Sequence, residues 1–311
     1  MADIKQMIFF DFEMLCSDNG MAYDMMEAIR LGAVKYDLET ESITYFDRYI
    51  RPENQEPLSD FCKALTGIDD QDLVGANDFA TVFEEFLAWV GGIKKSQYFS
   101  WSPSDLTRLK IDAEKHEIPL RTITKIEKRY IDFQAVFKKR VANNNVSVED
   151  ALALYGLEFS GEKHHPMYDA YNTLRIYLQF LHEPVQSDLI MLKQFILEDE
   201  LTSFEKEHLN QILAAHIKFD INLLVNQIRD VYRLRDVKKL FKPINRIVVK
   251  YENVIMNRSG IFTDENVRHA ELLSTFYHEL LQSYEEHVSY RSKIMILNEY
   301  LLRPLHVITS K

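Results

Sequence analysis

The chain has little cysteine and no long apolar run, and both shortages limit what it can be. It contains only two cysteines, Cys16 and Cys62. Their spacing fits neither a zinc site nor a disulfide framework, so we expect ordinary reduced thiols in a cytoplasmic protein. No apolar stretch approaches the roughly 18 residues that a membrane-spanning helix needs. The opening segment MADIKQMIFF is too short and turns acidic too soon for a secretory leader.

Basic residues are also in deficit. Lys and Arg number 37 against 48 Asp and Glu, which gives a formal net charge of -11. The protein as a whole therefore repels polyanions, and binding of nucleic acid would require local basic patches or bound cations. Two segments, residues 121–140 and 229–250, are locally basic. Each is either a solvated helix face or a surface for a nucleic-acid strand, and the second includes Lys238, Lys239 and Lys242.

The apolar pattern changes at Glu183-Pro184. Before this point short apolar runs alternate with amphipathic helices, which predicts an α/β domain over residues 1–183. The strands are expected at residues 7–11, 29–36, 42–50, 97–101 and 130–133, and the helices at residues 78–89, 104–116, 148–155 and 168–181. After this point the pattern predicts an all-helical domain over residues 184–311.

Two local signals place helices in the second domain. Thr202 with Glu205 three residues later predicts a capping box at the start of one helix. Residues 263–302 contain neither Gly nor Pro and predict one long helix that begins near Thr263. Its expected apolar face consists of Phe276, Leu280, Tyr284 and Val288.

The segment MIFFDFEML places two carboxylates directly after a buried strand. Asp11 and Glu13 are two residues apart, so their side chains lie on the same face of that strand. Two such carboxylates resist joint ionisation unless a cation lies between them, and divalent cations of the hard type prefer oxygen ligands. An Asp-x-Glu pair is common by chance, so further acidic residues are needed to indicate a metal site.

A third carboxylate lies in SWSPSDLTRLK. Asp105 stands at the start of a helix, with Ser102 as the expected N-cap and Pro103 at the first helical position. Asp105 therefore either completes a capping box or belongs to the same site as the first two carboxylates.

The fourth group lies in KHHPMYDAYNTL. Pro166 favours the start of a helix, which places Asp169 in its first turns and His164 on the preceding loop. Such a histidine can act as a general base beside a carboxylate held on a rigid helix. The alternative is a pair of loop histidines and an aspartate favoured by the helix dipole.

Taken together, these segments resemble the DEDDh 3′–5′ exonucleases, the family of proofreading subunits, ribonuclease T and oligoribonuclease. The similarity is greatest to the branch that trims RNA 3′ ends, including small interfering and histone RNAs. FFDFEMLC, SWSPSDLTRL and HHPMYDAYNTL resemble its three motifs, and LTGI and YIDFQAVF resemble two intervening segments. The resemblance covers about residues 5–182 and implies a ribonuclease H-like mixed sheet flanked by helices. Two residues depart from the family pattern: Pro166 replaces a common Ala, and Ser104 a common Tyr or Phe.

The resemblance implies a metal-dependent 3′–5′ exonuclease that releases nucleoside 5′-monophosphates from single-stranded nucleic acid with a free 3′ end, RNA being favoured over DNA. Asp11, Glu13 and Asp169 would hold two Mg²⁺ or Mn²⁺ ions. Asp105 would support the site, and His164 would be the general base.

The remaining implied residues concern substrate and an alternative base. The family spacing to the last aspartate selects His164, and His165 is the reserve candidate. Phe12, Met14, Leu65 and Thr66 would contact the last nucleotides of the strand. A competing hypothesis is a non-catalytic scaffold whose helical domain binds nucleic acid, a protein partner or a second copy. The intact set of acidic residues and histidine argues against an idle site.

Overall fold

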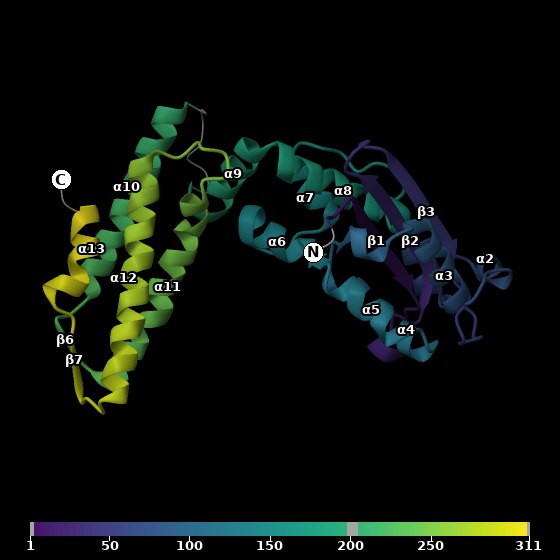
Figure 1. The fold of residues 1–311 in the computed structure, drawn as a ribbon, viewed down its shortest axis with the longest axis horizontal. Coiled ribbons are helices and arrows are strands. Elements are labelled where there is room, and N and C mark those ends of the chain that lie inside the picture. Colours follow the sequence, from purple (N-terminus) through teal and green to yellow (C-terminus); the bar gives the residue numbers. More distant parts are fainter. Residues whose placement is uncertain (1–2, 198–204, 310–311) are drawn as a thin grey trace. The chain divides into compact units, whose positions relative to one another are not determined.

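The computed structural model describes residues 3–197 and 205–309, and the chain divides into two compact units (Figure 1). Unit 1 comprises Met1–Lys139 and Asn144–His182, and unit 2 comprises Arg140–Asn143 and Glu183–Lys311. The longer segment of unit 2, Glu183–Lys311, begins where the apolar pattern changes. No sequence signal marks the shorter segment, Arg140–Asn143. None of the helices in the described part of the chain is long and apolar enough to cross a membrane.

Unit 1 is built on a five-stranded mixed sheet with the strand order β3-β2-β1-β4-β5. The strands are β1 (Gln6–Met14), β2 (Ala28–Asp37), β3 (Ile43–Tyr49), β4 (Ser96–Ser100) and β5 (Tyr130–Asp132). The first three strands pair antiparallel, and β4 and β5 extend the sheet in parallel with β1. All five predicted strands are present, and the mixed sheet flanked by helices confirms the predicted fold class.

Eight α-helices belong to the described part of unit 1. They are α1 (Asp60–Thr66), α2 (Asp70–Val74), α3 (Phe79–Val90), α4 (Pro103–Lys115), α5 (Leu120–Glu127), α6 (Phe133–Phe137), α7 (Val148–Leu154) and α8 (Pro166–His182). The four predicted helices correspond to α3, α4, α7 and α8. The other four have between 5 and 8 residues. Segments of that length are too short to display a helical period, which is why the sequence did not reveal them.

Strand β1 is covered on both faces, and its alternation decides where its carboxylates lie. Phe12 belongs to the apolar core that includes residues of α3, α4 and α5. Phe9 faces the other way, and its ring lies 5.5 Å from that of Tyr177 in α8. Asp11 and Glu13 follow Phe9 at steps of two residues, so they share the face of the sheet that α8 covers.

The start of α8 approaches the sheet unusually closely at one glycine. Gly32 of β2 pairs with Asp11 of β1. A Cβ atom on Gly32 would lie 2.0 Å from the backbone nitrogen of Met167, a distance that no side chain tolerates. The absence of a side chain at this position lets the first turn of α8 lie against the β2 backbone beside Asp11.

Unit 2 is helical, as predicted, with one short sheet that the sequence did not indicate. Its helices are α9 (Pro184–Leu192), α10 (Lys206–Gln227), α11 (Leu234–Met256), α12 (Asp264–Ser289) and α13 (Glu299–Thr309). The strands β6 (Val231–Arg233) and β7 (Ile294–Ile296) pair antiparallel. Helices α10, α11 and α12 run alongside one another and share one apolar core (Figure 1).

The long helix predicted from Thr263 is shorter than expected. Thr263 is the N-cap of α12, as the sequence indicated, but the helix ends at Ser289. Arg291 then adopts a left-handed conformation with φ 54°, and the Ser292 N–H donates to the His287 carbonyl. The chain thereby reverses into β7 without a Gly or Pro, so composition alone could not locate the end.

The expected apolar face of this helix is confirmed at three of its four residues. Phe276 and Leu280 are fully buried, and Tyr284 packs against the same core. Val288 is 47% exposed, because it lies in the last turn before the chain reverses. The predicted capping box at Thr202 lies outside the described residues.

Candidate active site

Three carboxylates from two elements meet beside the central strand. Asp11 and Glu13 come from β1, and Asp169 comes from the first turn of α8. One oxygen of each lies within 4.8 Å of the others. Within residues 3–197 and 205–309 these three form the only cluster of acidic, His or Cys side chains close enough to share a metal ion.

Asp105 is the fourth carboxylate of the site. Its side chain is buried, and Oδ1 accepts a hydrogen bond of 3.2 Å from the Phe12 N–H. It also hydrogen-bonds with the carboxyl group of Asp11. The N-cap of α4 is Ser102, whose hydroxyl accepts from the Ser104 N–H. A capping box would require the Asp105 side chain to bond back to the helix N-terminus. The side chain is directed to β1 instead.

The electrostatics of the four carboxyl groups are dominated by burial and mutual repulsion. The pKa of Glu13 is raised to about 8, mainly by burial and secondly by repulsion from Asp169 and Asp105. The positive charge of Arg30 acts in the opposite direction and lowers this pKa. Burial raises the pKa of Asp105 and of Asp169 to about 7. The pKa of Asp11 lies well above its usual range, because the group is buried and faces the other three carboxyls.

A divalent cation fits this set of side chains. Four clustered carboxylates, of which Asp105 is buried and the other three half-buried, cannot all ionise at neutral pH unless a positive charge offsets their desolvation and repulsion. Carboxylate oxygens are the ligands that Mg²⁺ and Mn²⁺ prefer, and three of them converge here. Asp11, Glu13 and Asp169 are the residues that would hold the metal.

The two adjacent histidines face different surroundings. His164 is exposed, adopts a left-handed conformation with φ 59° and lines the same cavity as the carboxylates. His165 is turned to the sheet, where its Nε2 lies 2.6 Å from Nη2 of Arg30. Arg30 in turn donates to both carboxylate oxygens of Asp47, at 2.8 and 2.7 Å. Burial and the charge of Arg30 lower the pKa of His165. The carboxylate cavity is therefore lined by His164, and His165 is occupied elsewhere.

A buried asparagine holds the loop that carries His164. The side chain of Asn172 in α8 donates to the Ser160 carbonyl at 2.9 Å and accepts from the Ser160 N–H at 3.1 Å. Nearer the site, a hydrogen bond from the His164 backbone to Asp169 lowers the pKa of that carboxyl against the effect of burial. The loop is thus attached at both ends to the helix that supplies Asp169.

The carboxylates open into a cavity of about 360 Å³. Among the residues predicted to contact substrate, Phe12 and Met14 line this cavity. Leu65 and Thr66 lie at the end of α1 and are not part of its lining. Leu65 is 40% exposed, and the Thr66 hydroxyl donates to the Cys62 carbonyl and accepts from the backbone.

Several lining residues were not anticipated from the sequence. Trp101 lies within the second motif and Lys163 directly precedes the third, so their positions in the chain were an available signal. The start of α7 contributes residues 147–149, and nothing in the sequence pointed to this segment. Lys163 forms an ion pair of 2.7 Å with Glu149, which joins the loop before α8 to this helix.

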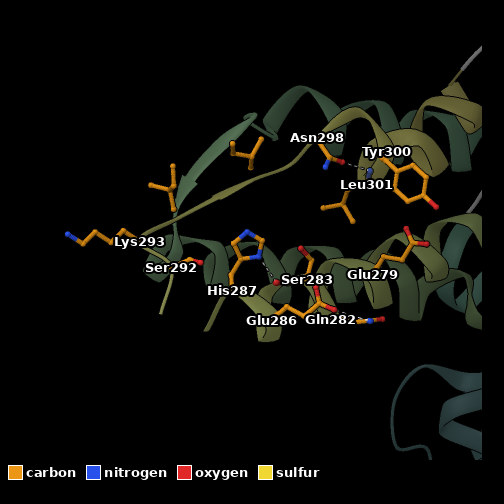
Figure 2. Close-up of a pocket in the computed structure, with 12 residues that line it drawn as sticks. Glu279, Gln282, Ser283, Glu286, His287, Ser292, Lys293, Asn298, Tyr300 and Leu301 are labelled. Atoms are coloured by element: carbon orange, nitrogen blue, oxygen red, sulfur yellow. Dashed lines mark hydrogen bonds between the residues drawn. The ribbon is translucent and has the colours of Figure 1, made fainter. Parts of the chain in front are cut away.

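Unit 2 contains a separate cavity of about 740 Å³ (Figure 2). It is lined by the end of α12, by β7 and by the start of α13, with Glu279, Glu286 and His287 among its polar groups. These groups bond locally: His287 contacts the Ser283 carbonyl at 2.7 Å, and Glu286 accepts from Gln282 at 3.3 Å. The cavity therefore lacks a convergent set of ligands such as unit 1 provides.

The fold and the site define the class of protein. A mixed sheet whose central strand carries an Asp-x-Glu pair, completed by an aspartate from a later helix, is the arrangement of a ribonuclease H-like nuclease. The sequence profile of the Exonuclease family (RNase_T) matches residues 8–177, which is more than half of the chain. The chain belongs to this family, and its motifs are those of the DEDDh 3′–5′ exonucleases, which use divalent metal ions.

Known relatives agree with this assignment over unit 1. ERI1 exoribonuclease 2 of Xenopus laevis is 25% identical over 194 residues, which are 55% of this chain and 28% of the relative. 3′-5′ exoribonuclease 1 of Mus musculus is 26% identical over 204 residues, which are 62% of this chain and 57% of the relative. The chain thus matches only part of the length of these relatives.

Two solved structures share the fold. The nuclease domain of 3′hExo, a DEDDh family member bound to rAMP, has a TM-score of 0.53 and 23% identity, covering 60% of this chain and 97% of that one. The cell-death related nuclease CRN-4 has a TM-score of 0.51 and 23% identity, covering 58% of this chain and 65% of that one. These similarities establish the ribonuclease H-like fold of unit 1.

Proposed function

We propose that the protein is a metal-dependent 3′–5′ exonuclease that hydrolyses single-stranded nucleic acid, with RNA favoured over DNA. The observation that carries this proposal is the convergence of Asp11, Glu13 and Asp169 within 4.8 Å in a cavity that His164 also lines. The preference for RNA is supported by the relatives, which are exoribonucleases. A 3′-terminal phosphodiester attacked by water would release a nucleoside 5′-monophosphate.

Each side chain of the site has a task in this reaction. Two Mg²⁺ or Mn²⁺ ions held by Asp11, Glu13 and Asp169 would, when bound, activate the attacking water and stabilise the charge that develops on the phosphate. His164 accepts the proton of that water in its neutral form. Asp105 orients Asp11 through their shared hydrogen bond.

The apolar part of the cavity serves the substrate. Phe12 is fixed by burial and by the hydrogen bond from its backbone to Asp105. Its side chain packs in the core, so Met14, which is partly exposed, offers the apolar surface against which the last base and ribose of a strand can pack. The cavity of about 360 Å³ is in the range of small-ligand sites, which suits a terminal nucleotide.

The proposal is tested by digestion of 5′-labelled RNA and DNA of one sequence, each with Mg²⁺, Mn²⁺ or EDTA. The wild-type protein should produce a ladder of single-nucleotide steps that EDTA abolishes. Asp11→Asn should abolish the ladder as well, because it removes a ligand without changing the size of the side chain. Asp60→Asn, which neutralises an exposed aspartate at the start of α1, is the matched control and should leave the ladder intact.

The relative rates of digestion of the labelled RNA and the labelled DNA show which of the two the enzyme prefers. A folded wild-type protein that cleaves neither strand with either metal would overturn the proposal. That result would favour the scaffold hypothesis, in which the helical region binds nucleic acid, a protein or a second copy.

A further inference from the structure

Helix α11 in unit 2 presents a row of positive side chains to solvent. The row consists of Arg235, Lys238, Lys239, Lys242 and Arg246, all of which are exposed. Since an α-helix turns by about 100° per residue, these five positions fall within an arc of about 100°. We call this row the α11 cationic stripe.

The orientation of the stripe is set by the apolar core on the opposite side of the helix. Val237, Ile244, Tyr251 and Val254 are fully buried and belong to the core of unit 2. Burial of these side chains prevents the helix from rotating about its axis. The stripe is therefore a fixed surface of unit 2 and not a set of charges on a mobile segment.

Little negative charge opposes the stripe. Asp236 is the only acidic residue between Arg235 and Arg246, and it pairs with Lys239 at 2.7 Å and with Arg235 at 4.0 Å. Over the part of the chain that the structure describes, neither Lys242 nor Arg246 has an acidic partner within ion-pair distance. The stripe thus retains an excess of positive charge in a protein whose net charge is -11.

An aromatic ring lies beside the stripe. The Lys238 ammonium is 5.8 Å from the centre of the Tyr284 ring, and Tyr284 packs edge-on against Phe241 at 5.1 Å. Rings next to cations are a recurrent feature of surfaces that bind single strands, because bases stack on them while cations follow the phosphates.

The other basic segment of the sequence carries no row of this length on a single helix. Residues 121–140 are divided among α5, β5, α6 and the π-helical turn Lys138–Ala142. Within it, Glu127 pairs with Lys110 at 2.6 Å, and Arg140 belongs to unit 2. Of the two runs that the sequence marks as basic, only the second carries five exposed cations along one face of one helix.

We propose that the α11 cationic stripe binds the sugar-phosphate backbone of a single-stranded nucleic acid. The choice of nucleic acid rests on the proposed exonuclease function, to which the stripe adds a second contact for the strand. At a rise of 1.5 Å per residue the stripe is about 16 Å long. A stacked strand carries one phosphate about every 3.4 Å, so a row of this length can follow roughly five phosphates.

The test measures binding without hydrolysis. Fluorescence anisotropy of a 5′-fluorescein single-stranded RNA of about 30 nucleotides is recorded in EDTA over a range of salt concentrations, with the full chain. The triple variant Lys238→Gln, Lys239→Gln, Lys242→Gln should bind at least tenfold more weakly at about 0.1 M salt. The slope of log K against log salt concentration should be smaller in magnitude by about 2 for this variant. Each lost phosphate contact on a single strand removes roughly 0.7 from the slope.

A matched triple variant separates the stripe from the net charge of the protein. Arg268→Gln, Lys293→Gln and Arg303→Gln neutralise three exposed cations elsewhere in unit 2 and change the net charge equally. This control should retain the wild-type slope. If the stripe triple does not fold, Lys242→Gln and Arg246→Gln are measured singly, and each should reduce the slope by about 0.7.

The outcomes distinguish this inference from the proposed function. A stripe triple that binds like the wild type, in a protein that digests RNA, overturns the stripe and leaves the exonuclease standing. Stripe-dependent binding by a wild-type protein that hydrolyses neither RNA nor DNA supports the stripe and overturns the exonuclease. Equal, stripe-dependent binding of poly-glutamate indicates an acidic protein partner and overturns the assignment to nucleic acid.

Discussion

Asp11, Glu13, Asp105 and Asp169 hold their protons to higher pH in the folded protein than in an unfolded chain. Their pKa values are raised from about 4, and those of Glu13, Asp105 and Asp169 reach about 8, 7 and 7. Between about pH 4 and pH 8 the folded state therefore binds more protons than the unfolded state. Stability of the metal-free protein must then fall as the pH rises through this range.

Removing one of these charges should stabilise the metal-free protein. In EDTA at pH 8, Asp169→Asn is expected to raise the free energy of unfolding by roughly 1–3 kcal/mol, because the buried negative charge is gone. The difference should shrink at pH 5, where Asp169 is protonated in the folded state. Urea unfolding at both pH values, with Asp60→Asn as the control, measures this. Equal stability of variant and wild type at pH 8 would contradict the burial of the charge.

Metal binding should reverse the pH dependence, since cations and protons compete for the same oxygens. Saturating Mg²⁺ is expected to raise the Tm more at pH 8 than at pH 6, as thermal unfolding would show. Glu13→Gln should reduce the shift at pH 8, because it removes one of the three converging carboxylates. A shift of the same size at both pH values would mean that Mg²⁺ does not bind at these groups.

The two adjacent histidines provide a matched pair for the general base. His164→Asn should lower kcat by about 10²- to 10⁴-fold, whereas His165→Asn should lower it by less than about tenfold. Because Glu13, Asp105 and Asp169 have raised pKa values and cations compete with protons for their oxygens, wild-type activity should climb from pH 6 towards mildly alkaline pH. Single-turnover digestion across pH 6 to 9 measures the variants and the pH profile. A larger loss in the His165 variant would count against His164, and a flat profile would count against a cation held by these carboxylates.

At the scale of elements, the site depends on the close approach of α8 to β2. Gly32→Ala places a methyl group 2.0 Å from the Met167 nitrogen, so the first turn of α8 must move away from the sheet with Asp169. We expect a loss of about 1–3 kcal/mol in unfolding free energy and a larger relative loss of activity. Gly75→Ala is the control, since a Cβ there meets nothing within 4 Å. Wild-type activity in Gly32→Ala would show that α8 need not lie so close.

The elements that the sequence predicted are those with a clear period or a clear boundary. The strands before Asp11 and after Ser42 are apolar runs or alternations, and α3 and α4 begin at residues that cap them, Asp78 and Ser102. The start of α7 is marked in the same way by its N-cap Ser147, but nothing in residues 147–149 indicates that they line the cavity, because that follows from how α7 packs.

At the scale of the whole molecule, the division into two units does not follow the chain order. Arg140–Asn143 belongs to unit 2 although residues of unit 1 precede and follow it. Within unit 2, Arg140 donates to the Asn253 side chain at 2.8 Å, and the Asn143 side chain donates to the Gln194 carbonyl at 3.0 Å. This short segment therefore contributes to the stability of the helical unit.

Removing the first of these bonds should weaken unit 2. Arg140→Ala is expected to lower the free energy of unfolding by about 1–2 kcal/mol, since it removes the hydrogen bond to Asn253 and the ion pair of 3.6 Å with Glu252. Hydrogen exchange should become faster in the last turns of α11, where Asn253 lies. Lys138→Ala, which removes an exposed lysine two residues earlier, should leave exchange there unchanged. Unaltered exchange in Arg140→Ala would show that the segment is not needed.

The sequence by itself determined which residues are available for chemistry and the order in which they occur. Asp11 and Glu13 must share a face because a strand alternates, and the motifs around Asp105 and Asp169 follow in the order of an exonuclease. Only the tertiary structure decided that the carboxylates converge, since this requires α8 to pack against β2 at Gly32. It also separates the surroundings of the two histidines, because His164 lines the cavity whereas the partner of His165 is Arg30, which is distant in the chain. Local rules act within a few residues, whereas these contacts join residues more than a hundred positions apart.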